Sequence, residues 1–269
     1  MSSVLPPLVT ALCWIGAGEA PPPQAAAPVE TLRWVETVAP AAAVRVVNPH
    51  GNVYARSGGA TDRVEVTAAV QNLGEPSRRL VVRVTRTSAG DVDVVVEPES
   101  EPEEPGGEEV LAHGPRDRID LGVLVPRGAA LDVRTGDGVI EAKGLGGAVS
   151  ASSVRGAIRV VAIEGRVGVE SGSGDVTGVF GSRVSSMPQW ISTKTGDVEV
   201  SVQETAGVEI QIATFGDISS EFPPHTESEA EPTPASKTHA RVLAGGGGST
   251  LTVTSDGGDV KVRRVPSLR

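Results

Sequence analysis

The sequence predicts an all-β fold in which short strands wind into a parallel solenoid. A five-residue pattern, Gly-x-Val/Ile-x-Val/Ala/Gly, recurs every nine residues at Gly138, Gly147, Gly156, Gly165 and Gly174. Its apolar residues stand two positions apart, the period of a strand with one buried face. Aromatic residues make up only 3% of the chain, so the core must consist of small branched side chains. A nine-residue unit cannot bury its apolar face alone, and the units are therefore expected to stack.

If two units make one turn of the chain, alternate units lie about 4.8 Å apart. The predicted inward row of one sheet is Ile140, Ile158, Val176, Val198 and Ile218, and that of the facing sheet is Val149, Val167 and Val208. The glycines are expected at the corners, because glycine tolerates positive φ without steric cost.

The outward positions of the first sheet form a predicted row of Glu141, Arg159, Thr177, Glu199 and Ser219. Glu141 and Arg159 can pair in this register, although an exposed ion pair contributes only about 0–1 kcal/mol. We interpret the row as a solvated face.

The N-terminal residues 1–20 are interpreted as a signal peptide, because the apolar stretch 4–17 is too short to cross a bilayer. A disordered tail is the alternative. Cys13, the one cysteine of the chain, follows Leu12 and not the small residue that a lipoprotein site requires. Cleavage would leave no thiol, which excludes a disulfide framework and a cysteine nucleophile. Residues 21–28 form a Pro/Ala-rich linker.

Residues 29–269 are predicted to form a single solenoid domain. The segment 29–38 is expected to be an edge strand or a cap, and 44–55 contains an early copy of the repeat at Gly51. Segments 64–70, 80–86 and 92–96 alternate apolar and polar residues, as half-buried strands do. Two acidic, Pro-rich insertions, 97–118 and 223–240, are expected to be disordered.

The regular repeats are assigned to residues 135–222 and 249–264. Their spacing loosens around Trp190, resumes at Gly196 and Gly216, and includes a late copy at Gly258. Trp190 is the one aromatic candidate for a contact residue, and a plug in the core is the alternative.

The segment 120–147, with Val125-Pro126 leading into successive Gly-x-Ile/Val units, resembles the bacterial DUF4097 family of adhesin-like β-strand repeat proteins. The resemblance covers about residues 44–262. It implies a right-handed, single-stranded β-helix-like solenoid, the hand that parallel crossovers favour. It also implies an exported or surface-associated protein, and it supplies no catalytic residues.

The formal net charge of −10 argues against a nucleic-acid partner, because such binding depends on Lys and Arg at phosphates. No segment is long enough for a transmembrane span. We expect a periplasmic, cell-surface or extracellular protein whose partner is a cell-envelope protein or a polysaccharide. The oligomeric state stays open.

Three functions fit the pattern: a non-enzymatic interaction or scaffolding module, a polysaccharide lyase or hydrolase, and a calcium-stabilised roll. The enzyme needs carboxylates about 5–9.5 Å apart across a groove. Its candidates are Asp175, Asp197, Asp217 and Asp259, which all follow a repeat glycine, where Gly-Asp is common in turns.

The calcium pattern requires a double glycine, which the nearest segment, 171–176, lacks. We therefore predict the interaction module, with no catalytic residues, cofactor or metal. The predicted contact surface consists of Trp190, Glu141, Arg159 and Glu199.

Overall fold

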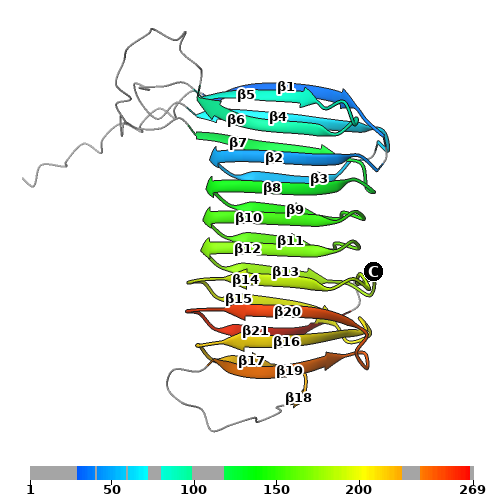
Figure 1. Ribbon diagram of the computed structural model, residues 1–269, viewed down its shortest axis with the longest axis vertical. Coiled ribbons are helices and arrows are strands. Elements are labelled where there is room, and N and C mark those ends of the chain that lie inside the picture. Colours follow the sequence, from blue (N-terminus) through cyan, green and yellow to red (C-terminus); the bar gives the residue numbers. More distant parts are fainter. Residues whose placement is uncertain are drawn as a thin grey trace, which may run out of the picture.

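In the computed structural model the chain forms two facing β-sheets that share one core (Figure 1). The structure describes residues 29–39, 41–58, 60–71, 80–98, 118–225 and 237–266, and contains no helix within them. The predicted all-β class is thus confirmed. The expected signal peptide and linker, and residues 99–117 and 226–236 of the expected insertions, lie outside the described residues.

Both sheets run the length of the molecule (Figure 1). Within the described residues, sheet A has the strand order β1 (Val29–Thr37), β4 (Arg63–Gln71), β7 (Arg118–Val125), β3 (Val53–Ser57), β9 (Ile140–Lys143), β11 (Ile158–Val161), β13 (Val176–Phe180), β15 (Val198–Gln203), β21 (Val260–Val265) and β17 (Ile218–Ser220). Sheet B has the order β18 (Pro224–His225), β19 (Thr238–Ala244), β16 (Val208–Thr214), β20 (Ser249–Ser255), β14 (Gln189–Thr193), β12 (Val167–Ser173), β10 (Val149–Arg155), β8 (Ala130–Asp137), β2 (Ala43–His50), β6 (Val92–Pro98) and β5 (Leu80–Arg86).

From β8 to β17 successive strands alternate between the sheets, and we call each such pair of strands a coil. Coils in the middle of the molecule stack in parallel with a shift of eighteen residues, so that Ile158 lies between Ile140 and Val176. These apolar side chains are at most 1% exposed. The nine-residue period therefore gives one strand of a coil, as the sequence predicts.

The ends of both sheets are antiparallel, so the sheets are mixed and the predicted right-handed parallel solenoid with irregular N-terminal strands is confirmed only as an all-β fold. β1 pairs antiparallel with β4, and β4 with β7; β5 pairs antiparallel with β6, and β19 with β16 and β18. Short connections such as that from β5 to β6 favour antiparallel pairing, because a parallel partner needs a long crossover. β1 is an edge strand of sheet A, one of the two forms expected for residues 29–38.

The coil of β20 and β21 lies out of sequence order, between the coil of β14–β15 and the coil of β16–β17 (Figure 1). It corrects both predicted inward rows. Val260 stands between Val198 and Ile218 in sheet A. In sheet B, Val149 and Val167 pair, but Val208 lies beside Ser249. A strand that pairs with the next repeat in sequence and one that pairs with the late repeat bury the same face. The periodicity of the sequence therefore cannot predict which of the two becomes the neighbour.

Alternate repeat glycines share a corner of the stack, where successive coils approach closely. A Cβ atom on Gly156 would collide with the carbonyl oxygen of Gly138, and one on Gly196 with that of Gly174. Gly138 and Gly196 are not among the glycines with positive φ. Close approach of backbones therefore explains these glycines better than the turn conformation expected from the sequence.

Candidate functional site

The outward face of sheet A carries the predicted row, with two additions. The row runs Tyr54, Glu141, Arg159, Thr177, Glu199, Lys261 and Ser219. Glu141 forms an ion pair with Arg56 at 3.5 Å and not with Arg159, and Glu199 pairs with Arg263 at 3.3 Å. The row alternates in charge and its acidic members are neutralised by exposed arginines, so it offers no concentrated binding feature.

Trp190 lies on the other side of the molecule, in sheet B. Its neighbours Gln189 and Ile191 point into the core, whereas Trp190 itself is half-buried and points outward. The position expected for a core plug is thus taken by Gln189, which is 2% exposed. The structure does not bring Trp190 together with Glu141, Arg159 and Glu199, because the shared core separates the two outward faces.

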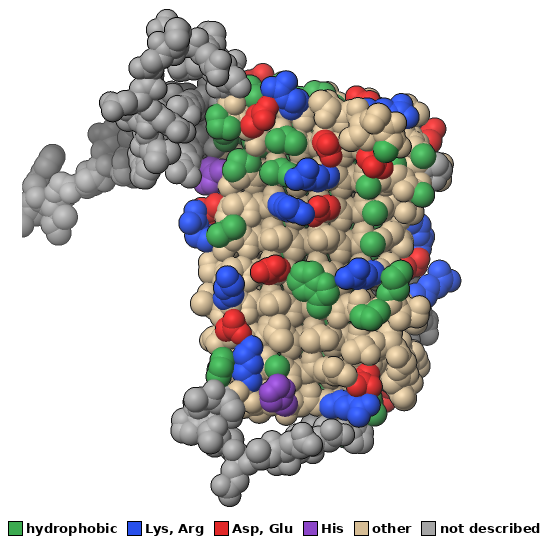
Figure 2. Space-filling view, viewed as in Figure 1, with side chains coloured by type: hydrophobic (Ala, Val, Ile, Leu, Met, Phe, Trp, Pro, Cys, Tyr) green, Lys and Arg blue, Asp and Glu red, His purple; other side chains and the backbone are tan. Residues whose placement is uncertain are grey.

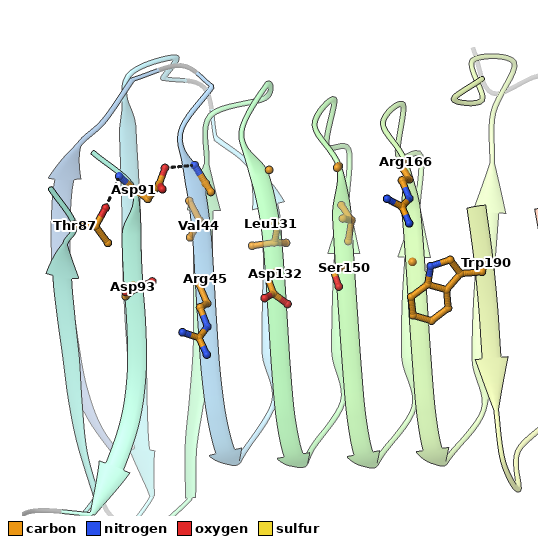
Figure 3. A pocket seen from close by; sticks show the side chains of 15 residues that line it. Val44, Arg45, Thr87, Asp91, Asp93, Leu131, Asp132, Ser150, Arg166 and Trp190 are labelled. Atoms are coloured by element: carbon orange, nitrogen blue, oxygen red, sulfur yellow. Dashed lines mark hydrogen bonds between the residues drawn. The ribbon is translucent and has the colours of Figure 1, made fainter. Parts of the chain in front are cut away.

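A row of outward side chains crosses sheet B from β6 to β14. Pairing of successive strands aligns Asp93, Arg45, Asp132, Ser150, Gly168 and Trp190. Two residues earlier in the chain, at or just before the starts of the same strands, stand Asp91, Ala43, Ala130, Ala148 and Arg166. Figure 3 shows Asp93, Arg45, Asp132 and Ser150 on successive strands, with Trp190 and Arg166 at the far end.

These two rows enclose an open hollow of about 460 Å³ on the face of sheet B (Figure 3). The small residues Ala130, Ala148 and Gly168 form its floor, and the long side chains of Arg166 and Trp190 rise beside them. Ligand pockets have volumes of about 300–1,000 Å³. The hollow, which we call the Trp190 hollow, is therefore large enough for a small ligand or for one unit of a polymer.

The indole of Trp190 lies over Gly168 on the adjacent strand. Its Cε2, Cζ2 and Nε1 atoms lie 2.9–3.0 Å from the position that a Cβ atom on Gly168 would occupy. Glycine at position 168 thus lets the ring settle on β12. A larger residue there would push the ring away from the sheet.

The charged groups of the hollow fall into two sets. Asp91 accepts a hydrogen bond from the Ala43 backbone at 2.8 Å, and Asp132 forms an ion pair with Arg134 at 3.2 Å. Among the described residues, Arg45, Arg166 and Asp93 form neither an ion pair nor a side-chain hydrogen bond. Two guanidinium groups and one carboxylate are consequently available to a ligand.

Charge is mixed on the face of the molecule that Figure 2 presents. Figure 2 shows acidic and basic side chains interspersed over the face it presents, with no extended field of one sign. Charges more than about 8 Å apart are largely screened at physiological salt. The local arrangement in the hollow, and not the net charge of the chain, therefore governs what it attracts.

The four aspartates considered for catalysis form one column along a corner of the stack. The backbone N–H groups of Asp197, Asp259 and Asp217 donate to the carboxylates of Asp175, Asp197 and Asp259, at 3.0, 2.8 and 2.9 Å. Three of the four carboxylates, those of Asp175, Asp197 and Asp259, thus cap a backbone amide of the next coil, in agreement with the turn interpretation. Within the described residues there is no group of three His, Cys, Asp or Glu side chains that could hold a metal ion.

Solved structures with similarity to this chain share little sequence with it. A protein of Clostridium sporogenes described as "a putative cell adhesion protein" is 12% identical, with a TM-score of 0.41 over 88% of this chain and 100% of the other. Proteins of Bacteroides fragilis and Parabacteroides distasonis, each described as a "putative adhesin", are 7% and 12% identical, each with a TM-score of 0.27 over 88% of this chain and 97% of the other. The sequence matches no family model and no curated protein.

Among the described residues, no helix has the length and apolar character needed to span a membrane.

Sequence reasoning missed most of the hollow. Asp132, Ser150 and Gly168 stand eighteen residues apart at outward positions, so the repeat period could have placed them in one row. Arg45 and Asp93 come from strands whose neighbours only the folded chain defines. Trp190 follows Gly168 by twenty-two residues, beyond the regular spacing.

Proposed function

We propose that this protein is an exported, non-enzymatic interaction module of the cell envelope, which holds its partner in an adhesin-like manner. The observation that carries the proposal is the Trp190 hollow. Its lining comes from β2, β8, β10, β12 and β14, which are fixed by parallel hydrogen-bonded pairing. A site on paired strands is held in place before the ligand arrives, which reduces the entropic cost of binding.

The acidic residues support binding over hydrolysis. A glycosidase needs one carboxyl group to donate a proton and another to act as base or nucleophile across the bond. In the hollow, Asp91 and Asp132 already accept bonds from Ala43 and Arg134, and the aspartates of the corner column cap backbone amides. These pairings favour structural roles for the carboxylates.

Further features belong to the same proposal. We place the chain in the DUF4097 family on the resemblance around Val125-Pro126, and assign a right-handed winding on the steric preference of parallel crossovers. Residues 1–20 act as the export signal, 21–28 as a linker, and 29–269 as one domain. Fractionation of cells that produce the tagged full chain tests export, since retention in the cytoplasm would contradict it.

The binding role is tested with the purified full chain on an array of envelope glycans and envelope proteins, with calcium and with chelator. We expect saturable binding that does not depend on calcium and releases no product. The Trp190→Ala and Arg166→Gln variants should lose that binding. Tyr54→Ala, which removes an exposed aromatic residue from sheet A, is the matched control and should bind as the unaltered chain does.

Turnover of a polysaccharide, abolished by Asp197→Ala, would replace the binding role by the enzymatic one. Binding only in calcium would favour the ion-stabilised roll. Absence of binding to every envelope component would contradict the proposed function as a whole.

A further inference from the structure

We propose that the Trp190 hollow binds a sugar unit that carries a carboxylate, within an acidic polysaccharide of the cell envelope. The inference rests on the proposed function and names its ligand class. It follows from three features of the hollow: an aromatic platform, two arginines without ion-pair partners among the described residues, and polar groups that can bind hydroxyls.

The platform is the indole of Trp190. One side of the ring settles over Gly168, and the half-buried side chain borders the hollow. The ring face carries partial negative charge and attracts the C–H groups of a ligand, as a pyranose ring presents on its apolar face. Stacking requires a flat, fixed ring, and the absence of a side chain at Gly168 provides room for one.

The two arginines select an anion. Arg166 directly precedes β12 and lies beside the indole, and Arg45 stands in the same row as Trp190, four strands away along sheet B (Figure 3). A guanidinium group matches a carboxylate with two parallel hydrogen bonds. Neither arginine has an ion-pair partner in the described part of the chain, so a ligand need not displace one.

Two further polar groups of the hollow suit hydroxyls. Asp93 and Ser150 have no side-chain hydrogen bond among the described residues and line the hollow. A carboxylate accepts hydrogen bonds from sugar hydroxyls, and a serine hydroxyl both donates and accepts. Arg134 neutralises Asp132, and the two guanidinium groups of the hollow stand against the carboxylates of Asp91 and Asp93, so selection of an anion rests on the guanidinium geometry and not on a net positive charge.

The shape agrees with one unit of a longer chain. The hollow is open to solvent, and its lining residues run along the stack from β6 to β14. A closed pocket would accept only a free monosaccharide, whereas an open one lets a polymer enter and leave at both ends. Its volume of about 460 Å³ is enough for one or two sugar rings.

The test is isothermal titration of the full chain with trigalacturonate, and with cellotriose as a neutral trisaccharide. We expect trigalacturonate to bind at least about tenfold more tightly, because bonds between charged groups are the stronger ones. Its affinity should fall with added salt. Equal affinity for the two probes, or tighter binding of cellotriose, would overturn the inference.

Two variants locate the site. Arg166→Gln should weaken trigalacturonate at least about tenfold and leave cellotriose nearly unchanged, whereas Trp190→Ala should weaken both. Arg159→Gln is the matched control: Arg159 is exposed, has no ion-pair partner among the described residues, and lies on the opposite face. An effect of Arg159→Gln equal to that of Arg166→Gln would show binding by general charge and reject the site.

Folding of each variant is checked by its urea midpoint, and Trp190→Phe provides a second aromatic platform if Trp190→Ala unfolds.

Failure of this inference differs from failure of the proposed function. If the full chain binds an envelope component and both Arg166→Gln and Trp190→Ala bind it equally well, the interaction role stands, but the Trp190 hollow is not its site and the acidic-sugar inference is wrong.

Discussion

A column of glycines and hydroxyls runs along one corner of the stack and explains the repeat residue by residue. Side-chain hydroxyls from sheet B donate to the glycine carbonyl of a neighbouring coil: Ser153 to Gly138, Ser171 to Gly156, Thr193 to Gly174, Ser255 to Gly196 and Thr214 to Gly258. These hydroxyls are buried, and a buried polar group without a partner costs about 1–3 kcal/mol. Each coil thus contains a glycine, which leaves space for the carbonyl of the neighbouring coil, and a hydroxyl side chain, which donates a hydrogen bond to a glycine carbonyl.

Gly156→Ala tests the close approach. The new Cβ would meet the Gly138 carbonyl and would also require φ of 145° from alanine. We expect a loss of about 1–3 kcal/mol or more in the free energy of unfolding, measured by urea denaturation. Gly181→Ala is the control, because nothing lies within 4 Å of its Cβ position. Equal stability of the two variants would contradict the packing explanation.

Glu209 gives a pH-dependent contribution at the same scale. Hydrogen bonds from Arg241 and Gln211 hold the pKa of Glu209 below its ordinary value of 4.5. Because the pKa of Glu209 is lower in the folded chain, its carboxylate stabilises the fold at every pH above the ordinary pKa. This stabilisation is lost as the pH falls through the lowered pKa.

Glu209→Gln should therefore lower the free energy of unfolding by up to about 1 kcal/mol at neutral pH. The difference should shrink as the pH falls below 4.5, and urea midpoints of both chains across that range measure it. Glu170→Gln, at an exposed position of β12, controls for loss of a carboxylate as such. A difference that stays constant with pH would contradict the assigned cause.

At the scale of elements, the coil of β20 and β21 determines how the lower half of the molecule closes. β20 pairs in parallel with β14 on one side and β16 on the other, and β21 does the same between β15 and β17. β19 then covers β16 from the other side in antiparallel pairing. The late repeat thereby fills a place between two earlier coils, so the edges of those coils are not left open to other chains.

Engineered disulfides distinguish this order from the order in sequence. Ser192 pairs with Thr254, and Thr254 with Ala213. Neighbouring strands lie about 4.8 Å apart, within the Cα separation of a disulfide, whereas strands two apart do not. In a Cys13→Ser background, Ser192→Cys with Thr254→Cys should form an intramolecular bond on mild oxidation, detected by mass spectrometry. The double variant Ser192→Cys with Ala213→Cys should form no such bond. A bond in this second variant and none in the first would show that the coils stack in the order of the sequence.

At the scale of the whole molecule, the candidate site exists because coils stack. The Trp190 hollow takes residues from positions 43 to 190, and no single repeat contains more than a few of them. Its floor is formed by small residues that lie in register on adjacent strands. Its wall is formed by Trp190, which lies where the spacing of the sequence repeats becomes irregular. The predicted contact residues Glu141, Arg159 and Glu199 share the opposite face and contribute nothing to it.

Gly168→Ala tests this assembly without removing the platform. The added methyl group would stand within 3.0 Å of three indole atoms, so the ring must shift while the sheet stays paired. We expect sugar affinity to fall several-fold, because the ring would be displaced from its resting position, with little change in the urea midpoint, because the half-buried indole can shift toward solvent while the core stays packed. Gly181→Ala serves again as the control. Unchanged affinity would show that the resting position of Trp190 is not needed for binding.

The sequence by itself determined the class of fold, the strand period and the buried face of each repeat, because alternation of apolar residues and the spacing of glycines are local properties. It also assigned the turn role of Asp175 and its equivalents, since Gly-Asp turns are set by neighbours in the chain. The tertiary structure alone decided the antiparallel ends, the placement of β20–β21 and the separation of Trp190 from Glu141. Each of these features depends on which neighbouring strand a given strand pairs with. In a repeating sequence several neighbours are possible, and pairing with any of them buries the same residues.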